Sequence, residues 1–62
     1  MVRTVVQAGD TLWELAAAAY EAAGIPSESV DLRPVIYEIR KRNRMTSAQI
    51  VPGQVVLIPV RR

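Results

Sequence analysis

The side chains best suited to chemistry are two carboxylates, Asp10, which directly follows Gly9, and Glu14, four residues later. A glycoside hydrolase needs two carboxyl groups a defined distance apart, on either side of a substrate cleft. A chain of 62 residues is too small to wall such a cleft. Thr11 and Glu14 have the spacing of a capping box, in which each side chain bonds the backbone N–H of the other residue at a helix start. We therefore predict that these carboxylates begin a helix and that the chain is not an enzyme.

The composition excludes several other kinds of site. The sequence contains no cysteine and no histidine, so we expect no disulfide, no zinc finger, no Cys- or His-based catalytic pair, no metal and no cofactor. Half of the residues are apolar and the net charge is only +2, which is typical of a folded chain. No apolar run reaches the roughly 18 residues of a membrane span, so we expect none.

Four segments must position the remaining functional groups. An alternating, β-branched stretch predicts a strand at about residues 2–7. Spaced leucines and alanines predict a helix at about 11–23, and a second apolar periodicity after Asp31 predicts another at about 32–43. A valine-rich stretch that ends in proline predicts a second strand at about 55–60. The polar connector between the helices has room for a single helical turn.

This order predicts an α+β fold of the βααβ type. Two isolated strands are marginal in water. We therefore expect them to pair antiparallel, with both helices packed on one face, as a single domain over residues 1–62. The predicted core is Val6, Leu12, Leu15, Ala16, Ala19, Ile36, Ile39, Val56 and Ile58.

Two sequence blocks at opposite ends of this pattern resemble those of the LysM (lysin motif) domain family. Residues 6–16 read V-Q-A-G-D-T-L-W-E-L-A and resemble the family's opening V-x-x-G-D-T-L-x-x-I-A. Residues 50–59 read I-V-P-G-Q-V-V-L-I-P and resemble its closing I-x-P-G-Q-x-L-x-I-P. Asn43 falls where the family places an Asn at the end of its second helix. The resemblance covers nearly the whole chain.

The chain departs from the family pattern in three places. Thr4 stands where Tyr is usual, and Val56 stands where Leu is common. The connector at residues 25–33 is longer than usual. A longer surface loop costs little stability, so the fold is not in doubt, but the surface beside the second helix changes.

The resemblance implies a module that binds glycans containing N-acetylglucosamine, either peptidoglycan or chitin-type chains. In the family the sugar lies in a shallow groove between the loop after the first strand and the loop before the second. Carried over to this sequence, the groove residues are Gly9, Asp10, Thr11 and Leu12 on one side and Arg44, Met45, Thr46, Ile50 and Val51 on the other.

The residue types fit such a groove on physical grounds. A sugar acetamide pairs with backbone N–H and C=O groups as a peptide does. Gly9 exposes its backbone, and we expect free N–H groups at residues 10–12, because the first turn of a helix has no internal acceptors. Met45, Ile50 and Val51 would form an apolar lip for the acetyl methyl group.

Several residues have two readings. Trp13 either packs over its helix and Tyr20 or stacks on a sugar ring, and Tyr37 is ambiguous in the same way. Met45 either fills a gap or contacts the ligand. Asn43 either ends the second helix in a left-handed conformation or contacts the ligand.

The basic cluster of Arg40, Lys41, Arg42 and Arg44 invites a nucleic-acid hypothesis. The cluster has no interleaved aromatic residues, and positive charge at a helix C-terminus complements the helix dipole. We therefore expect no nucleic-acid partner. Attraction to anionic cell-wall polymers stays open as a third use.

We predict a non-catalytic module that tethers a larger, multidomain protein to the cell wall. Met1 to Thr4 lack the pattern of a secretory signal, so we expect the export signal elsewhere in the parent protein. The alternative is a structural or protein-interaction module in a spore-coat or phage-tail assembly.

Overall fold

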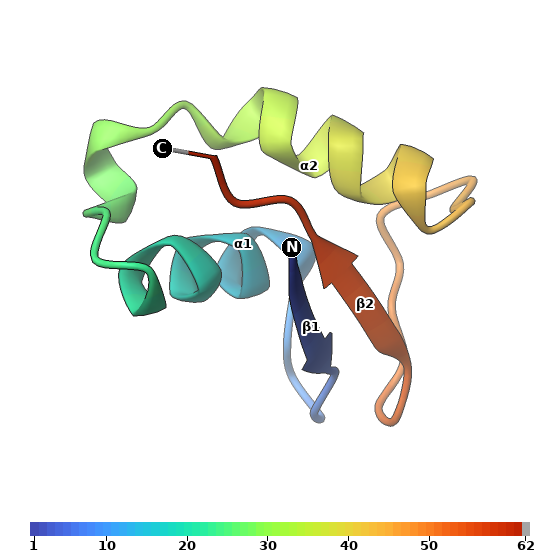
Figure 1. The fold of residues 1–62 in the computed structure, drawn as a ribbon. Coiled ribbons are helices and arrows are strands. Elements are labelled where there is room, and N and C mark those ends of the chain that lie inside the picture. The colour runs from blue at the N-terminus through green and yellow to red at the C-terminus, as the bar shows by residue number, and fades with distance from the viewer. Residues whose placement is uncertain (62) are drawn as a thin grey trace.

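The computed structural model describes residues 1–61 and has the predicted order of elements (Figure 1). The elements are β1 (Val2–Val5), α1 (Leu12–Ala22), the short 3-10 helix η1 (Ser27–Ser29), α2 (Leu32–Arg42) and β2 (Val55–Ile58). β1 and β2 form a two-stranded antiparallel sheet in which Val2 lies opposite Ile58 and Val5 lies opposite Val55. The predicted α+β, βααβ fold is confirmed.

Both strands are two residues shorter than predicted. After β1, the Gln7 amide donates to the Asp10 carboxylate over 2.8 Å instead of to the neighbouring strand. β2 ends at Ile58, because Pro59 has no N–H to continue the ladder.

The predicted capping box is present at the start of α1. Thr11 Oγ1 accepts from the Glu14 amide, and Glu14 Oε1 accepts from the Thr11 amide, each over 3.1 Å. At the other end Gly24 has a φ of +82°, and the Ile25 amide donates to the Tyr20 carbonyl over 3.0 Å. This bond and the positive φ of Gly24 are features of a Schellman motif, which ends the helix.

The connector between the helices is tied to both of them. Its single turn, η1, is held to α1 by the Ser27 amide, which donates to Glu21 Oε2 over 2.7 Å and lowers the pKa of the Glu21 carboxyl. Asp31 caps α2 by accepting from the Arg33 amide over 3.1 Å. The Arg33 side chain also bonds this carboxylate, and these bonds lower the pKa of Asp31.

The core lies between the helices and one face of the sheet, since the residues on the opposite face of both strands are exposed. Its buried side chains are Val6, Leu12, Ala16, Ala19, Tyr20, Leu32, Val35, Ile39, Val56 and Ile58. Leu15 and Ile36, also predicted for the core, are partly buried and pack against it.

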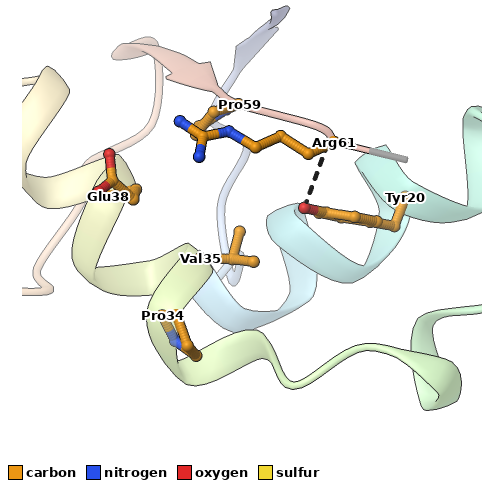
Figure 2. A pocket seen from close by; sticks show the side chains of 6 residues that line it. All are labelled: Tyr20, Pro34, Val35, Glu38, Pro59 and Arg61. Carbon is orange, nitrogen blue, oxygen red and sulfur yellow. Dashed lines mark hydrogen bonds between the residues drawn. The ribbon is translucent and has the colours of Figure 1, made fainter.

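Tyr20 and Trp13 lie in different surroundings although both belong to α1. Tyr20 is only 4% exposed, and its hydroxyl accepts from the Arg61 amide over 3.4 Å (Figure 2). A small cavity of about 130 Å³ separates this contact from Pro34 and Val35 of α2. Trp13 is 52% exposed. The C-terminal segment therefore covers Tyr20 and leaves the tryptophan open to solvent.

The end of α2 is joined to β2 by the Asn43 side chain. Its Nδ2 donates to the Ile39 carbonyl over 2.7 Å and to the Leu57 carbonyl over 2.9 Å, and its Oδ1 accepts from the Leu57 amide over 3.0 Å. Asn43 itself has a φ of −98°, so the predicted left-handed conformation is wrong for this residue. The next residue, Arg44, takes that conformation, with a φ of +54°.

The alternation of an antiparallel ladder explains why Leu57 is free to bind Asn43. The Val6 amide donates to the Gln54 carbonyl over 2.8 Å, which makes this a hydrogen-bonded pair. Hydrogen-bonded and non-hydrogen-bonded pairs alternate along an antiparallel ladder. Arg3, three residues before Val6, lies opposite Leu57, so Arg3 and Leu57 form a non-hydrogen-bonded pair. The amide and carbonyl of Leu57 therefore point away from β1, and the Asn43 carboxamide binds both of them.

We predict that Asn43→Ala lowers the free energy of unfolding by about 2 kcal/mol, because it removes three hydrogen bonds and leaves the amide and carbonyl of Leu57 without their side-chain partner. Urea unfolding measures the loss. Gln49→Ala, which truncates an exposed side chain of the next loop, is the matched control. A loss no greater than that of the control would show that the Asn43 bridge does not stabilise the fold.

Candidate functional site

The two predicted groove loops leave the sheet at the same end. Antiparallel pairing places the last residue of β1 beside the first residue of β2. The turn that follows β1 and the turn that precedes β2 therefore lie next to each other, at the bottom of Figure 1. Two backbone bonds join them: the Val6 amide donates to the Gln54 carbonyl, and the Gly53 amide donates to the Val6 carbonyl, each over 2.8 Å. The two walls of the candidate site are thus fixed to one another at the base.

The first wall is a tight turn around Gly9. The Gln7 amide donates to Asp10 Oδ2 over 2.8 Å, and the Asp10 amide donates back to the Gln7 carbonyl over 3.1 Å. Gly9 has a φ of +88°, and nothing lies within 4 Å of the position that a Cβ would occupy. The top of the turn is therefore open backbone that another molecule can approach closely.

The expectation of free N–H groups at residues 10–12 is wrong for two of the three. The Asp10 amide donates to the Gln7 carbonyl, and the Thr11 amide donates to the Glu14 carboxylate. Both amides therefore stabilise the turn itself. Of the amides of residues 10–12, the Leu12 amide alone has no acceptor, as is usual at the first position of a helix. The Leu12 side chain is buried in the core.

The second wall begins with a tight turn at the end of α2. The Met45 amide donates to the Arg40 carbonyl over 2.8 Å, and the Arg44 amide donates to the Lys41 carbonyl over 3.3 Å. Arg40 then holds the outgoing loop, since its Nη2 donates to the Thr46 carbonyl over 2.8 Å. Arg44 and Thr46 are exposed.

The second wall closes with a turn at residues 51–54. The Gln54 amide donates to the Val51 carbonyl, and Gln54 Oε1 accepts from the Val51 amide, each over 3.1 Å. Gly53 has a φ of +89°, as the Pro-Gly turn predicts. The Val51 side chain stays 62% exposed.

The structure brings three of the predicted site residues into one apolar cluster. Met45 and Ile50 are partly buried and pack against the core that contains Leu12. Val51, the third residue of the predicted apolar lip, is exposed. The site therefore combines an open glycine turn, one helix-start amide and an apolar edge.

The two carboxylates of this arrangement already have partners within the chain. The Asp10 and Glu14 carboxylates are both occupied with backbone amides of the turn that begins α1. Residues 1–61 contain no cluster of three carboxylate, thiol or imidazole groups that could hold a metal ion. Within the same residues no helix is long and apolar enough to cross a membrane.

Sequence comparison agrees with the fold and with this geometry. The family model of the LysM domain matches residues 4–30 and 36–59, which is most of the chain. The chain belongs to the LysM domain family. LysM domains are binding modules for peptidoglycan and related N-acetylglucosamine glycans and act at the cell wall. The match is interrupted at residues 31–35, where the long connector meets the first turn of α2.

The chain is also similar to a cell division suppressor protein, YneA, of Bacillus pumilus (strain SAFR-032). The two are 36% identical over 61 residues, a match that covers 98% of this chain and 54% of the relative. The chain thus spans about half the length of this larger protein. No solved structure matches the chain significantly.

Arg40 and Gln54 shape the candidate site although neither was predicted to do so, and Asn43, which was predicted to end α2, does so through a contact that was not predicted. Arg40 holds the loop through the Thr46 carbonyl, Gln54 closes the turn after Val51, and Asn43 anchors the end of α2. Gln54 and Asn43 belong to the motifs that carry the family resemblance, so their positions were visible in the sequence. Their partners were not, because those contacts depend on the folded loop.

We predict that Arg44→Gly raises the free energy of unfolding by about 0.5 to 1 kcal/mol, because glycine takes a positive φ without the steric cost that arginine pays. Arg42→Gly, two residues earlier within α2, also replaces an arginine by glycine, but at a helical position. It should lower the free energy of unfolding by up to about 1 kcal/mol. Thermal or urea unfolding compares the two. Effects of the same sign would contradict the left-handed conformation of Arg44.

Proposed function

We propose that this LysM domain binds N-acetylglucosamine glycans in the groove between the Gly9 turn and the loop of residues 44–51. The observation that carries the proposal is the convergence of these two segments at one end of the sheet, with open backbone on one side and a partly exposed apolar cluster on the other.

Each part of the groove has a counterpart in the sugar. The Leu12 amide and the exposed peptide groups at Gly9 offer donors and acceptors to an acetamide group, in the manner of a short β-pairing. Met45 and Ile50 offer apolar surface to its methyl group and to the sugar ring. Gly9 has a particular role, because any side chain there would project into the open space that the sugar needs.

We infer that the domain acts as a non-catalytic tether. A groove this shallow buries little of its ligand, so one module binds weakly and gains strength from a polymeric ligand or from neighbouring modules. The longer relative fits a domain that forms part of a larger protein. A wall-binding role places the domain outside the cell.

We predict that N-acetylglucosamine oligomers shift the amide resonances of Gly9, Leu12 and residues 44–51 when titrated into the labelled domain. The fluorescence of Trp13, the single tryptophan, gives an independent readout because it is half exposed one residue after Leu12. Shifts confined to the rest of the chain would contradict the site. An absence of shifts with all oligomers, joined by failure to bind insoluble peptidoglycan or chitin, would contradict the function.

A pair of variants makes the site assignment sharper. Val51→Asp places a charge on the exposed part of the apolar lip and should weaken oligomer binding at least fivefold, or about 1 kcal/mol. Ala18→Asp makes the same charge change at an exposed position of α1 and should leave the affinity unchanged. Thermal unfolding of both variants confirms that the comparison concerns folded protein.

A further inference from the structure

We infer that a basic, aromatic pocket beside the groove binds a carboxylate carried by the wall glycan, and so favours peptidoglycan over neutral chitin. The pocket lies between α2 and the loop that follows it, has a volume of about 220 Å³, and is lined by Tyr37, Arg40, Lys41 and Met45. This inference rests on the proposed function, because the glycan in the groove would bring the carboxylate to the pocket.

The two cations of the pocket have no carboxylate partner in the described chain. The ion pairs there join Asp31 to Arg33 and Glu38 to Arg42, on other parts of α2 and its start. Arg40 donates through Nη2 to a neutral carbonyl, and its Nε is shielded from solvent with no hydrogen-bond partner. A half-buried guanidinium in this state has uncompensated charge, which an anion in the pocket would offset.

The pocket presents positive charge without competing acceptors. Carbonyl oxygens at a helix C-terminus normally repel an anion. Here the carbonyls of Ile39, Arg40 and Lys41 accept hydrogen bonds from Asn43, Met45 and Arg44 respectively. The carbonyl groups nearest the pocket are therefore occupied.

The aromatic residue fixes the position of the second cation. Lys41 Nζ lies over the Tyr37 ring, 6.0 Å from its centroid, one helical turn away. Tyr37 is 62% exposed, so its ring faces solvent on the wall of the pocket. The contact holds the ammonium group at the pocket instead of leaving it free in solution.

Met45 connects this pocket to the groove. It lines the pocket and also belongs to the apolar cluster of the proposed second wall. A substituent on a sugar bound against Met45 therefore lies next to Lys41. Chitin chains carry no charge, whereas peptidoglycan carries carboxylates on its stem peptides and, where a stem peptide is absent, on the lactyl ether of its muramic acid.

The test measures the affinity of the whole domain for three ligands of matched length: a chitin oligomer, a peptidoglycan strand stripped of its peptides, and the same strand with its peptides. We expect the wild type to bind a carboxylate-bearing strand about fivefold more tightly than the neutral oligomer at low salt. Preference for the stripped strand assigns the lactyl carboxylate, and preference only for the peptide-bearing strand assigns a peptide carboxylate. Added salt should reduce either preference.

Two matched variants separate the pocket from general charge attraction. Lys41→Gln keeps most of the aliphatic stem over Tyr37 and should abolish the preference while leaving chitin-oligomer affinity unchanged. Arg3→Gln makes the same charge change on the exposed face of β1 and should keep the preference.

Two results would overturn the inference and leave the proposed function intact. One is equal affinity of the wild type for neutral and charged ligands. The other is an equal loss of preference in Arg3→Gln and Lys41→Gln, which would show diffuse attraction to net positive charge. Failure of all three ligands to bind would instead overturn the proposed function on which the inference rests.

Discussion

The carboxamide of Asn43 is the contact on which the rest of this small structure depends. A two-stranded sheet is marginal in water, and the outer edge of β2 would otherwise expose the amide and carbonyl of Leu57. Asn43 binds both groups and the Ile39 carbonyl, so one side chain joins the last turn of α2 to the sheet. With 62 residues and no disulfide, the fold has few other ways to fix that helix end.

That constraint extends directly into the site. Once the end of α2 is fixed, Arg44 must turn the chain in a left-handed conformation, and the Met45 amide closes the turn on α2. The loop then returns to the sheet beside the Gly9 turn, because antiparallel pairing brings the two strand ends together. The loop of the proposed groove and the adjoining basic pocket are thus consequences of how the chain ends one helix and enters the next strand.

Local signals in the sequence predicted most of the fold. The capping box at Thr11 and the positive φ at Gly24 and Gly53 each depend on neighbouring residues alone, and the structure has all three. The predicted second strand was two residues too long, because it ran past Pro59. The wrong prediction for the end of α2 concerns a contact with a distant part of the chain. Arg44 takes the left-handed position that Asn43 was expected to occupy, because Asn43 is bound to Leu57, 14 residues away.

The candidate site was predictable in its location but only in part in its chemistry. The family motifs indicate which two loops form the groove, and the structure places those loops together. The motifs do not reveal that the amides of Asp10 and Thr11 are already bound within the chain. The proposed recognition therefore relies on Gly9, Leu12 and the apolar cluster. The same carboxylates that resembled a catalytic pair are used to build the turn.

The most direct measurement is the contact map of the bound sugar, from intermolecular NOEs in a complex with an N-acetylglucosamine oligomer. The account predicts NOEs from one acetyl methyl group both to the side chains of Met45 or Ile50 and to the amides of Gly9 or Leu12. NOEs that connect the sugar to only one of the two loops, or to residues outside both, would contradict a groove formed between them.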